Sequence, residues 1–373
     1  MNELSLNNSP PKIKTHFSFL DSLRGIAAFW VLFYHTNSNG RLIKLEEILP
    51  DWLSTVIFKW GSLGVSIFFV LSGFVIAHSL REAKVNFNYL QRFTLRRFAR
   101  LSPPYYVSIL IALAFALISS YVKGNVFAPM GQHLSVERLL THLFYAQSFF
   151  GFRNIDDVYW TLCLEVQFYL VFSILLGLSQ WLERRFYIEY TLAMVFVPAA
   201  FIAVLYPLNI LGDGARPITF LPLWYGFLLG VFAYWSWQCK LKNILFYGYA
   251  TILLVAGIVN SSSFAIACVI TAITILEVAK ANCLETWLNW RCLQFLGKIS
   301  YSLYLTHVPL LGAVIFIVDK LFHQSLVSDL LSLVLGSISC VGFAAIMWQL
   351  VEKPSIKLSQ NIKLVNSREI MKA

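Results

Sequence analysis

Charge is what this sequence has least of. Only 13% of its 373 residues are Asp, Glu, Lys or Arg, whereas 58% are hydrophobic, 16% are aromatic and the mean hydropathy is +0.67. A soluble domain carries about a quarter charged residues. Apolar runs recur from residue 19 to residue 350 with only short polar breaks, which excludes an ordinary soluble domain. The predicted fold class is therefore all-α, an integral membrane bundle of transmembrane helices.

Motifs of several other protein classes are also missing. The six cysteines are dispersed and form no CxxC pair, so neither a metal site nor a disulfide framework is expected. The sequence has no Gly-rich phosphate loop and no internal repeat, so a transporter built from two repeated halves is not indicated. The segment MNELSLNNSPPKIKTHFSF is polar, and the first apolar run after it lacks a small-residue cleavage site, so residues 1–18 are expected to form a cytoplasmic tail and not a signal peptide.

Windows of about 20 residues predict ten membrane helices. They lie near residues 19–36, 61–80, 103–122, 158–180, 188–206, 217–236, 241–259, 262–279, 297–318 and 327–350. With the N-terminus inside, the inner segments hold 20 of the 29 Lys and Arg residues and the outer loops hold 8. This asymmetry predicts that both termini are cytoplasmic, with a membrane domain over residues 19–356 and a tail over residues 357–373. It also explains much of the net charge of +10 without a nucleic-acid partner.

Ionisable residues stand near both ends of the first predicted span, FLDSLRGIAAFWVLFYHT. Arg24 and His35 are eleven residues apart, which places them within about 20° of the same helix face and roughly 16 Å apart along the axis. An ionisable side chain in a membrane is costly, and it often marks a functional site. The simpler interpretations are an anchor paired with Asp21 for Arg24, and an interfacial histidine bonded to a carbonyl for His35.

Two later segments also combine charge with apolar surroundings. In RRFARLSPPYY, Arg97 and Arg100 are three residues apart, so a short helix before Pro103 would direct both toward phosphate oxygens. Ordinary cytoplasmic positive charge is the alternative. In DVYWTLCLEVQFYL, Glu165 lies about seven residues into an apolar span, beside aromatic residues such as Trp160. Its alternative role is a hydrogen bond that holds two helices together.

One further segment gathers hydroxyl groups and a histidine at the start of the ninth predicted span. The segment is GKISYSLYLTHVPL, which contains Ser300, Tyr301, Tyr304 and His307. These residues are candidates for contacts with a polar substrate. An aromatic belt at the membrane interface is the alternative interpretation.

In this order, the segments resemble the acyltransferase family 3 of polytopic membrane acyltransferases, which includes bacterial surface-polysaccharide O-acetyltransferases. The resemblance covers about residues 19–356 and rests on six elements: the Arg and His of the first span, FFVLSGFVI, the Arg-x-x-Arg segment, YWTLCLE, SYSLYLTH and the terminal VEKP. Each element alone is weak, but all six in order are specific. Thr161 and Cys163 stand where the family has serines, so no hydroxyl nucleophile is expected there. No fused extracytoplasmic domain is expected after VEKP.

The resemblance implies an O-acyltransferase that moves an acetyl group from acetyl-CoA to a hydroxyl of a cell-surface saccharide, such as lipopolysaccharide, exopolysaccharide or a lipid-linked precursor. Acetyl-CoA is expected as a donor substrate and not as a permanently bound cofactor. The implied catalytic residues are His35, as general base or acyl relay, and Glu165. The implied coenzyme-binding residues are Arg24, Arg97 and Arg100. The expected acceptor-binding residues are Trp160, Tyr301 and His307.

A multi-pass protein of the bacterial inner membrane is expected, in contact with lipid and with a homo-oligomer left open. Four alternatives remain at this point: transfer of a succinyl or longer acyl group, a lipid or antibiotic acceptor, a solute transporter or flippase, and a scaffold protein. A flippase needs no acetyl-CoA and yields no acetylated product, so dependence on the coenzyme separates it from an acetyltransferase.

Overall fold

The computed structural model describes residues 16–38, 40–212 and 217–364, which form helices, turns and loops without any strand among them. The helices are α1 (Ser18–Thr36), α2 (Ile43–Ile48), α3 (Asp51–Ser54), α4 (Gly64–Ser79), α5 (Phe87–Lys123), α6 (Val136–Leu143), α7 (Tyr159–Phe186), α8 (Thr191–Leu205), α9 (Trp224–Trp237), α10 (Asn243–Val259), α11 (Ser263–Lys280), α12 (Arg291–Phe322), α13 (Leu326–Met347) and α14 (Lys353–Asn361). The all-α prediction is confirmed. The two predicted tails lie mostly outside the described residues.

Six helical segments of the described chain are long and apolar enough to cross a membrane. They are Asp51–Ser79, Phe87–Lys123, Tyr159–Phe186, Ser263–Lys280, Arg291–Phe322 and Leu326–Asn361. Two shorter apolar helices, α8 and α10, accompany them. These segments agree with a multi-pass membrane protein. The total of ten spans and the orientation of the termini stay predictions.

Helix α5 differs most from the prediction. The sequence suggested a basic loop, a short helix and then a new span at Pro103, whereas α5 is one helix of 37 residues that continues through Pro103 and Pro104. Asn86 caps its start, where its side chain accepts a hydrogen bond of 2.8 Å from the N–H of Tyr89. The two arginines of RRFAR therefore lie within a long helix, and its packing determines where they point.

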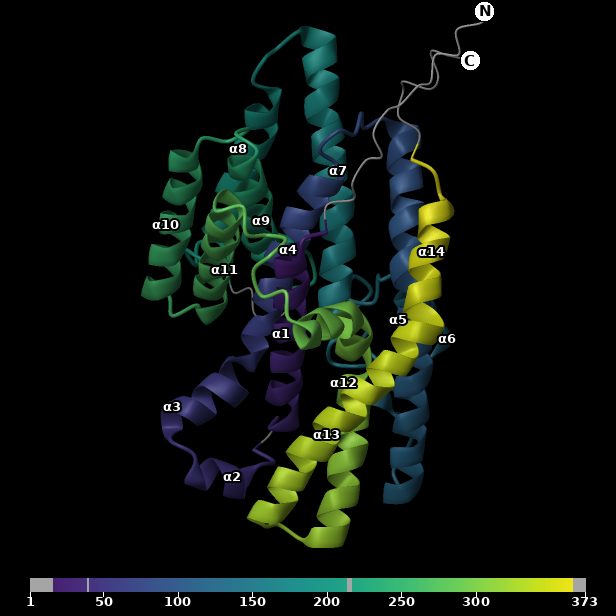
Figure 1. Cartoon of the computed structure of the whole chain (residues 1–373). Helices are drawn as coiled ribbons and strands as arrows, with labels where there is room; N and C mark the ends of the chain where they lie inside the picture. The colour runs from purple at the N-terminus through teal and green to yellow at the C-terminus, as the bar shows by residue number, and fades with distance from the viewer. Residues whose placement is uncertain (1–15, 39, 213–216, 365–373) are drawn as a thin grey trace, which may run out of the picture.

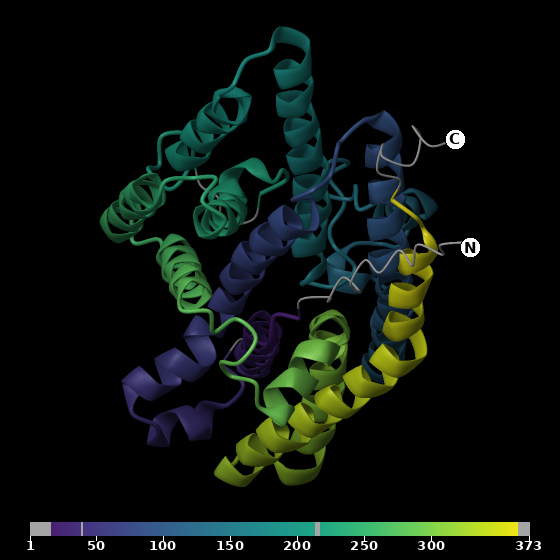
Figure 2. The same cartoon turned by 45° about the horizontal axis from the view of Figure 1, so that its top comes forward.

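Two groups of helices flank α4. Helices α8 to α11 lie on one side, and α1, α12, α13, α5 and α14 lie on the other (Figures 1 and 2). At the crossing of α4 and α9, a Cβ on Gly73 would stand 1.9 Å from the carbonyl oxygen of Phe227, and one on Gly230 would stand 1.9 Å from that of Val70. Only glycine fits these positions, because the two backbones touch. This contact joins the two groups.

Helix α1 lies near the centre of the bundle and contacts both α4 and α12 (Figure 1). A Cβ on Gly297 of α12 would stand 2.2 Å from the carbonyl oxygen of Asp21, and one on Gly25 of α1 would stand 2.7 Å from the backbone nitrogen of Gly297. Small residues allow membrane helices this close approach. Because Arg24 precedes Gly25, the contact determines where its guanidinium lies relative to α12.

Buried polar groups hold the segment that leads from α5 to α7. Arg138 is 0% exposed, and its guanidinium donates to the backbone carbonyls of Arg153 and Asn154, at 3.1 and 3.0 Å. Asp156 follows, is 4% exposed, and accepts a hydrogen bond of 3.2 Å from the N–H of Val158. Burial raises the pKa of the Asp156 carboxyl to about 7. These contacts fix the position at which α7 begins.

We expect Gly297→Ala to destabilise the contact between α1 and α12, since its new methyl group would overlap the backbone at Asp21. Overpacking of this kind costs about 1–3 kcal/mol, so the thermal midpoint in detergent should fall by several degrees. Gly312→Ala is the matched control, because it lies on the same helix and has no atom within 4 Å of its would-be Cβ. Equal midpoints for the two variants would show that the close contact does not limit stability.

We expect Asp156→Asn to remove a pH dependence of stability. The pKa of Asp156 is raised from 3.8 to about 7 on folding, so the folded protein is most stable with this carboxyl protonated and loses stability as the pH rises from about 4 to about 7. Asparagine keeps an acceptor for the N–H of Val158 but cannot ionise. The free energy of unfolding of the variant, relative to that of the wild type, should rise by up to about 4 kcal/mol across that pH range. A constant difference between the thermal midpoints of the two proteins would contradict this.

Candidate active site

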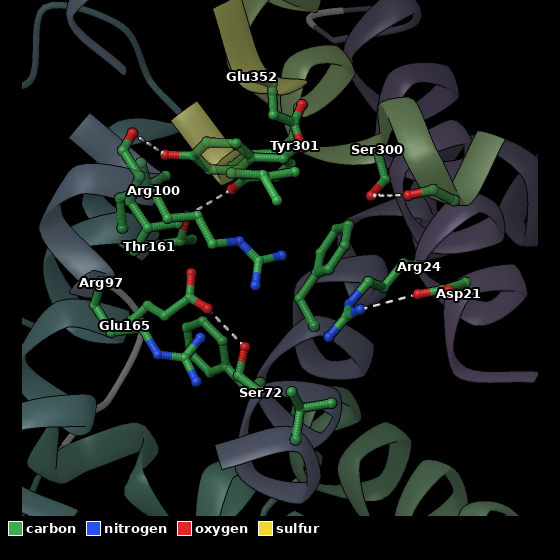
Figure 3. Close-up of a pocket in the computed structure, with 18 of the residues that line it drawn as sticks. Asp21, Arg24, Ser72, Arg97, Arg100, Thr161, Glu165, Ser300, Tyr301 and Glu352 are labelled. Carbon is green, nitrogen blue, oxygen red and sulfur yellow. Dashed lines mark hydrogen bonds and ion pairs between the residues drawn. The ribbon is translucent and has the colours of Figure 1, made fainter. Parts of the chain in front are cut away.

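Five of the eight expected site residues line one cavity of about 400 Å³. They are Arg24, Arg97, Arg100, Glu165 and Tyr301. Helices α1, α4, α5, α7 and α12 form its walls together with the chain at the end of α13 (Figure 3). Each of the six sequence elements that carry the family resemblance contributes at least one lining residue. Segments more than 300 residues apart in the sequence therefore meet at one site.

Arginines reach this cavity from two sides. Arg24 extends from α1, whereas Arg97 and Arg100 extend from α5 opposite it (Figure 3). The pairing with Asp21 expected as the simpler role of Arg24 is present, since Nη1 lies 3.1 Å from a carboxylate oxygen of Asp21. Both residues of that pair also line the cavity, and Lys298 adds a fourth basic side chain. Arg24 can therefore pair with Asp21 and line the cavity at the same time.

The two arginines of α5 have different surroundings. The Arg97 guanidinium lies over two aromatic rings, 4.8 Å from the centroid of Tyr169 and 5.2 Å from that of Phe93. The Arg100 guanidinium projects into the open centre of the cavity (Figure 3). Arg97 is therefore part of the wall, and Arg100 faces Arg24 across the space that a ligand would fill. Arg97 and Arg100 both line the cavity, and their predicted joint grip on a phosphate stays a prediction.

Glu165 occupies the wall between α4 and α7. One of its carboxylate oxygens accepts a hydrogen bond of 2.7 Å from the hydroxyl of Ser72 and another hydrogen bond from the hydroxyl of Tyr169. The helix-to-helix bond that was the alternative role of Glu165 is therefore present, and Glu165 also faces the cavity (Figure 3). Sequence reasoning did not select Ser72 or Tyr169. The signals were available, since Ser72 lies within FFVLSGFVI and Tyr169 lies one helical turn after Glu165.

A second buried carboxylate in the lining was also missed. Glu352, from VEKP, is 5% exposed and accepts bonds from the N–H and the hydroxyl of Ser302, at 3.2 and 2.6 Å. Ser302 lies in SYSLYLTH, so this interaction joins two of the six elements. The neighbouring Tyr301 donates its hydroxyl to the carbonyl of Leu101 at 2.9 Å, which fastens α12 to α5. Tyr301 thus has a structural partner as well as a place in the lining.

His35 and His307 do not line the cavity, but they lie behind one of its walls. Their rings are 5.0 Å apart, and the His307 ring is 5.9 Å from that of Tyr304, which does line the cavity. Nδ1 of His307 lies 3.1 and 2.9 Å from the carbonyls of Leu303 and Tyr304, so we assign its hydrogen to Nδ1. Nε2 is then an acceptor, and within the described residues it has no hydrogen-bond partner. The Tyr304 hydroxyl lies 2.8 Å from that of Thr161.

Trp160 lines a different cavity, of about 450 Å³. The three residues expected to bind the acceptor are therefore separated: Tyr301 lies in the first cavity, Trp160 in the second, and His307 in the protein interior between α1 and α12. Sequence spacing could not have separated them, because Trp160 and Thr161 are consecutive residues that face different cavities.

Comparisons with known proteins identify relatives of this chain. The family model described as an acyltransferase domain matches residues 17–349. A peptidoglycan O-acetyltransferase of Listeria monocytogenes is 28% identical over 196 residues, which are 50% of this chain and 29% of that protein. A putative O-acetyltransferase of Staphylococcus aureus is 26% identical over 386 residues, with 94% of this chain and 58% of that protein covered.

A further relative is a regulator of hypoxia-inducible factor 1 from Caenorhabditis elegans, 30% identical over 205 residues, which are 49% of this chain and 39% of that protein. The chain thus spans between 29% and 58% of the length of these three relatives. No solved structure matches the chain.

Proposed function

The chain belongs to the acyltransferase 3 family, and from that premise we propose that it transfers an acetyl group from acetyl-CoA to a hydroxyl of a cell-surface saccharide in the bacterial inner membrane. The observation that carries the proposal is the single cavity on which all six sequence elements converge, with basic side chains on two opposite walls. The names of the two bacterial relatives, a peptidoglycan O-acetyltransferase and a putative O-acetyltransferase, support both the acetyl group and a hydroxyl acceptor.

The basic walls fit the phosphate groups of coenzyme A. Arg24 and Arg100 face each other across the centre (Figure 3), and guanidinium groups bind phosphate oxygens through two parallel hydrogen bonds. Arg97 adds positive charge from the wall. With the phosphates held there, the narrow pantetheine arm extends past Thr161 and Tyr304 and brings the thioester toward His307 and His35.

The reaction requires one proton to leave the acceptor. The acceptor oxygen attacks the thioester carbon, the bond between carbon and sulfur breaks, and the hydroxyl proton passes through a base to the departing thiolate of coenzyme A. We assign the role of the base to His35. The ring of its neighbour His307 presents a nitrogen that can accept a hydrogen bond. In the relay version, His35 takes the acetyl group first and coenzyme A leaves as the thiol before the acceptor attacks. Glu165 keeps the facing wall in place through Ser72 and Tyr169.

We expect Arg100→Ala to weaken coenzyme A binding by roughly 10- to 100-fold, because a charge-assisted hydrogen bond contributes about 1.5–3 kcal/mol. Calorimetric titration of the detergent-purified protein with coenzyme A would measure this affinity. Arg92→Ala is the matched control, since Arg92 is a partly exposed arginine of the same helix that does not line the cavity. Equal affinities for wild type and Arg100→Ala would reject the phosphate-binding role.

We expect His35→Ala to lower acetyl transfer by about 10²–10⁴-fold with little change in coenzyme A affinity, the range found for loss of a general base. Membranes with matched amounts of folded protein would receive labelled acetyl-CoA, and label in the saccharide fraction would be counted. His133→Ala, at an exposed histidine, should behave as wild type. Full activity of His35→Ala would reject both the base and the relay. A wild type that transfers no label would reject acetyl transfer to a saccharide and favour another acyl group, another acceptor or a transporter.

A further inference from the structure

A second cavity, of about 450 Å³, lies where α7, α9 and α11 begin and where α8 and α10 end. Its lining includes buried or half-buried aromatic residues, among them Tyr225, which is 3% exposed, and Phe264. Its rim carries the exposed amides of Asn209 and Asn260. No charged side chain of the described residues lines it. It therefore differs in chemistry from the first cavity, whose walls carry four basic side chains.

Aromatic rings and amides in one lining suit a carbohydrate. A sugar ring presents C–H groups on its faces, which pack on aromatic rings, and hydroxyl groups at its edge, which both donate and accept. The amide of Asn209 offers both a donor group and an acceptor group to such hydroxyls, and Asn260, whose amide nitrogen donates to the carbonyls of Pro207 and Ala256, offers its side-chain oxygen. An acyl chain would not need the amides, and a phosphate would need positive charge. The lining thus selects a neutral polyhydroxyl ligand.

The rim of this cavity is held by hydrogen bonds between helices. Asn260, at the end of α10, donates its amide to the carbonyl of Pro207 at 3.0 Å, just past the end of α8. Gln167 of α7 accepts from the N–H of Phe220 at 2.9 Å and thereby fixes the chain that leads into α9. Asn260, in the lining, and Gln167, outside it, therefore hold the chain segments on two sides of the cavity in place.

Aromatic rings from the linings of the two cavities are in contact with each other. Phe69 lines the first cavity and Trp160 lines the second, and their rings meet edge to face with centroids 6.5 Å apart. Phe69 also contacts Phe264 of the second cavity, at 5.8 Å. Trp160 is followed directly by Thr161, whose hydroxyl meets that of Tyr304 on the wall nearest the histidines. A ligand beside Trp160 is thus close to the proposed path of the thioester.

We propose that the second cavity binds the saccharide acceptor and presents its hydroxyl to the thioester across the wall formed by Phe69 and Trp160. This inference rests on the proposed function, since it names the place of the acceptor in that reaction. The predicted topology agrees with it, because the lining residues adjoin loops predicted outside the membrane near residues 207–216 and 260–262. The basic walls of the first cavity adjoin segments predicted inside. Donor and acceptor then enter by separate openings.

The test measures transfer of labelled acetyl from acetyl-CoA to the saccharide fraction extracted from the cells that supply the membranes. Both substrates are varied in turn. Trp160→Ala should raise the KM for the saccharide fraction at least tenfold and leave the KM for acetyl-CoA within twofold. Asn209→Gly should raise the saccharide KM threefold or more, and it retains the left-handed backbone of this exposed residue, whose φ is 59°. Trp181→Ala, at an exposed tryptophan of the same helix, should change neither constant.

The outcomes distinguish a failure of this inference from a failure of the proposed function on which it rests. Transfer by the wild type with unchanged saccharide KM in Trp160→Ala and Asn209→Gly would reject the second cavity as the acceptor site and leave the acetyltransferase in place. A raised KM for acetyl-CoA in these variants, with the saccharide KM unchanged, would assign the cavity to the donor instead. No transfer by the wild type, in membranes that bind coenzyme A, would reject the acetylated saccharide as product and this inference with it. If Trp160→Ala fails to fold, Asn209→Gly decides alone.

Discussion

The backbone contact of α1 with α12 and α4 is the constraint on which the site depends. Gly25 and Gly297 bring α1 and α12 together so closely that no other residue fits either position without movement. This contact places Arg24 opposite the arginine of α5 that projects into the cavity, and it brings His35 against His307 at the other end of the same helix. One helix thus positions both a cation of the first cavity and the proposed base, because its register against α12 is determined by glycine.

A polar cavity inside an apolar bundle also requires its charges to be compensated. The lining contains four basic residues, namely Arg24, Arg97, Arg100 and Lys298, and three acidic ones, namely Asp21, Glu165 and Glu352. Each acid has hydrogen-bond partners on the protein, and one of them, Asp21, pairs with Arg24, whereas the Arg100 guanidinium is directed at the open centre of the cavity. An uncompensated cation is costly in a medium of low polarity. An anionic ligand between the arginines reduces that cost, which favours binding of the donor's phosphates.

The sequence predicted the fold class, and five of the eight candidate residues line the first cavity, because those predictions rest on local or ordered features. Hydropathy located a helix at each of the ten expected ranges, and motif order brought Arg24, Arg100 and Glu165 into one group. The continuity of α5 through two prolines was not predictable, since local rules stop a helix there and only tertiary packing maintains it. Glu352 was missed because nothing in VEKP itself shows that its carboxylate meets Ser302, 50 residues away. Separation of Trp160 from Tyr301 depends on helix rotation, which hydropathy does not report.

The wall between the two cavities constrains how the proposed reaction can proceed. Phe69 is stacked on Phe227 with centroids 4.3 Å apart, and Phe227 is stacked in turn on Phe168 at 4.1 Å, so Phe69 belongs to a column of rings in the core. Trp160 is half-buried in the first turn of α7 and contacts Phe69 only by an edge. Moving Phe69 would disrupt the column, whereas Trp160 packs only at the border of this core. The proposed transfer therefore requires Trp160, the less buried of the two rings, to turn aside when an acceptor binds.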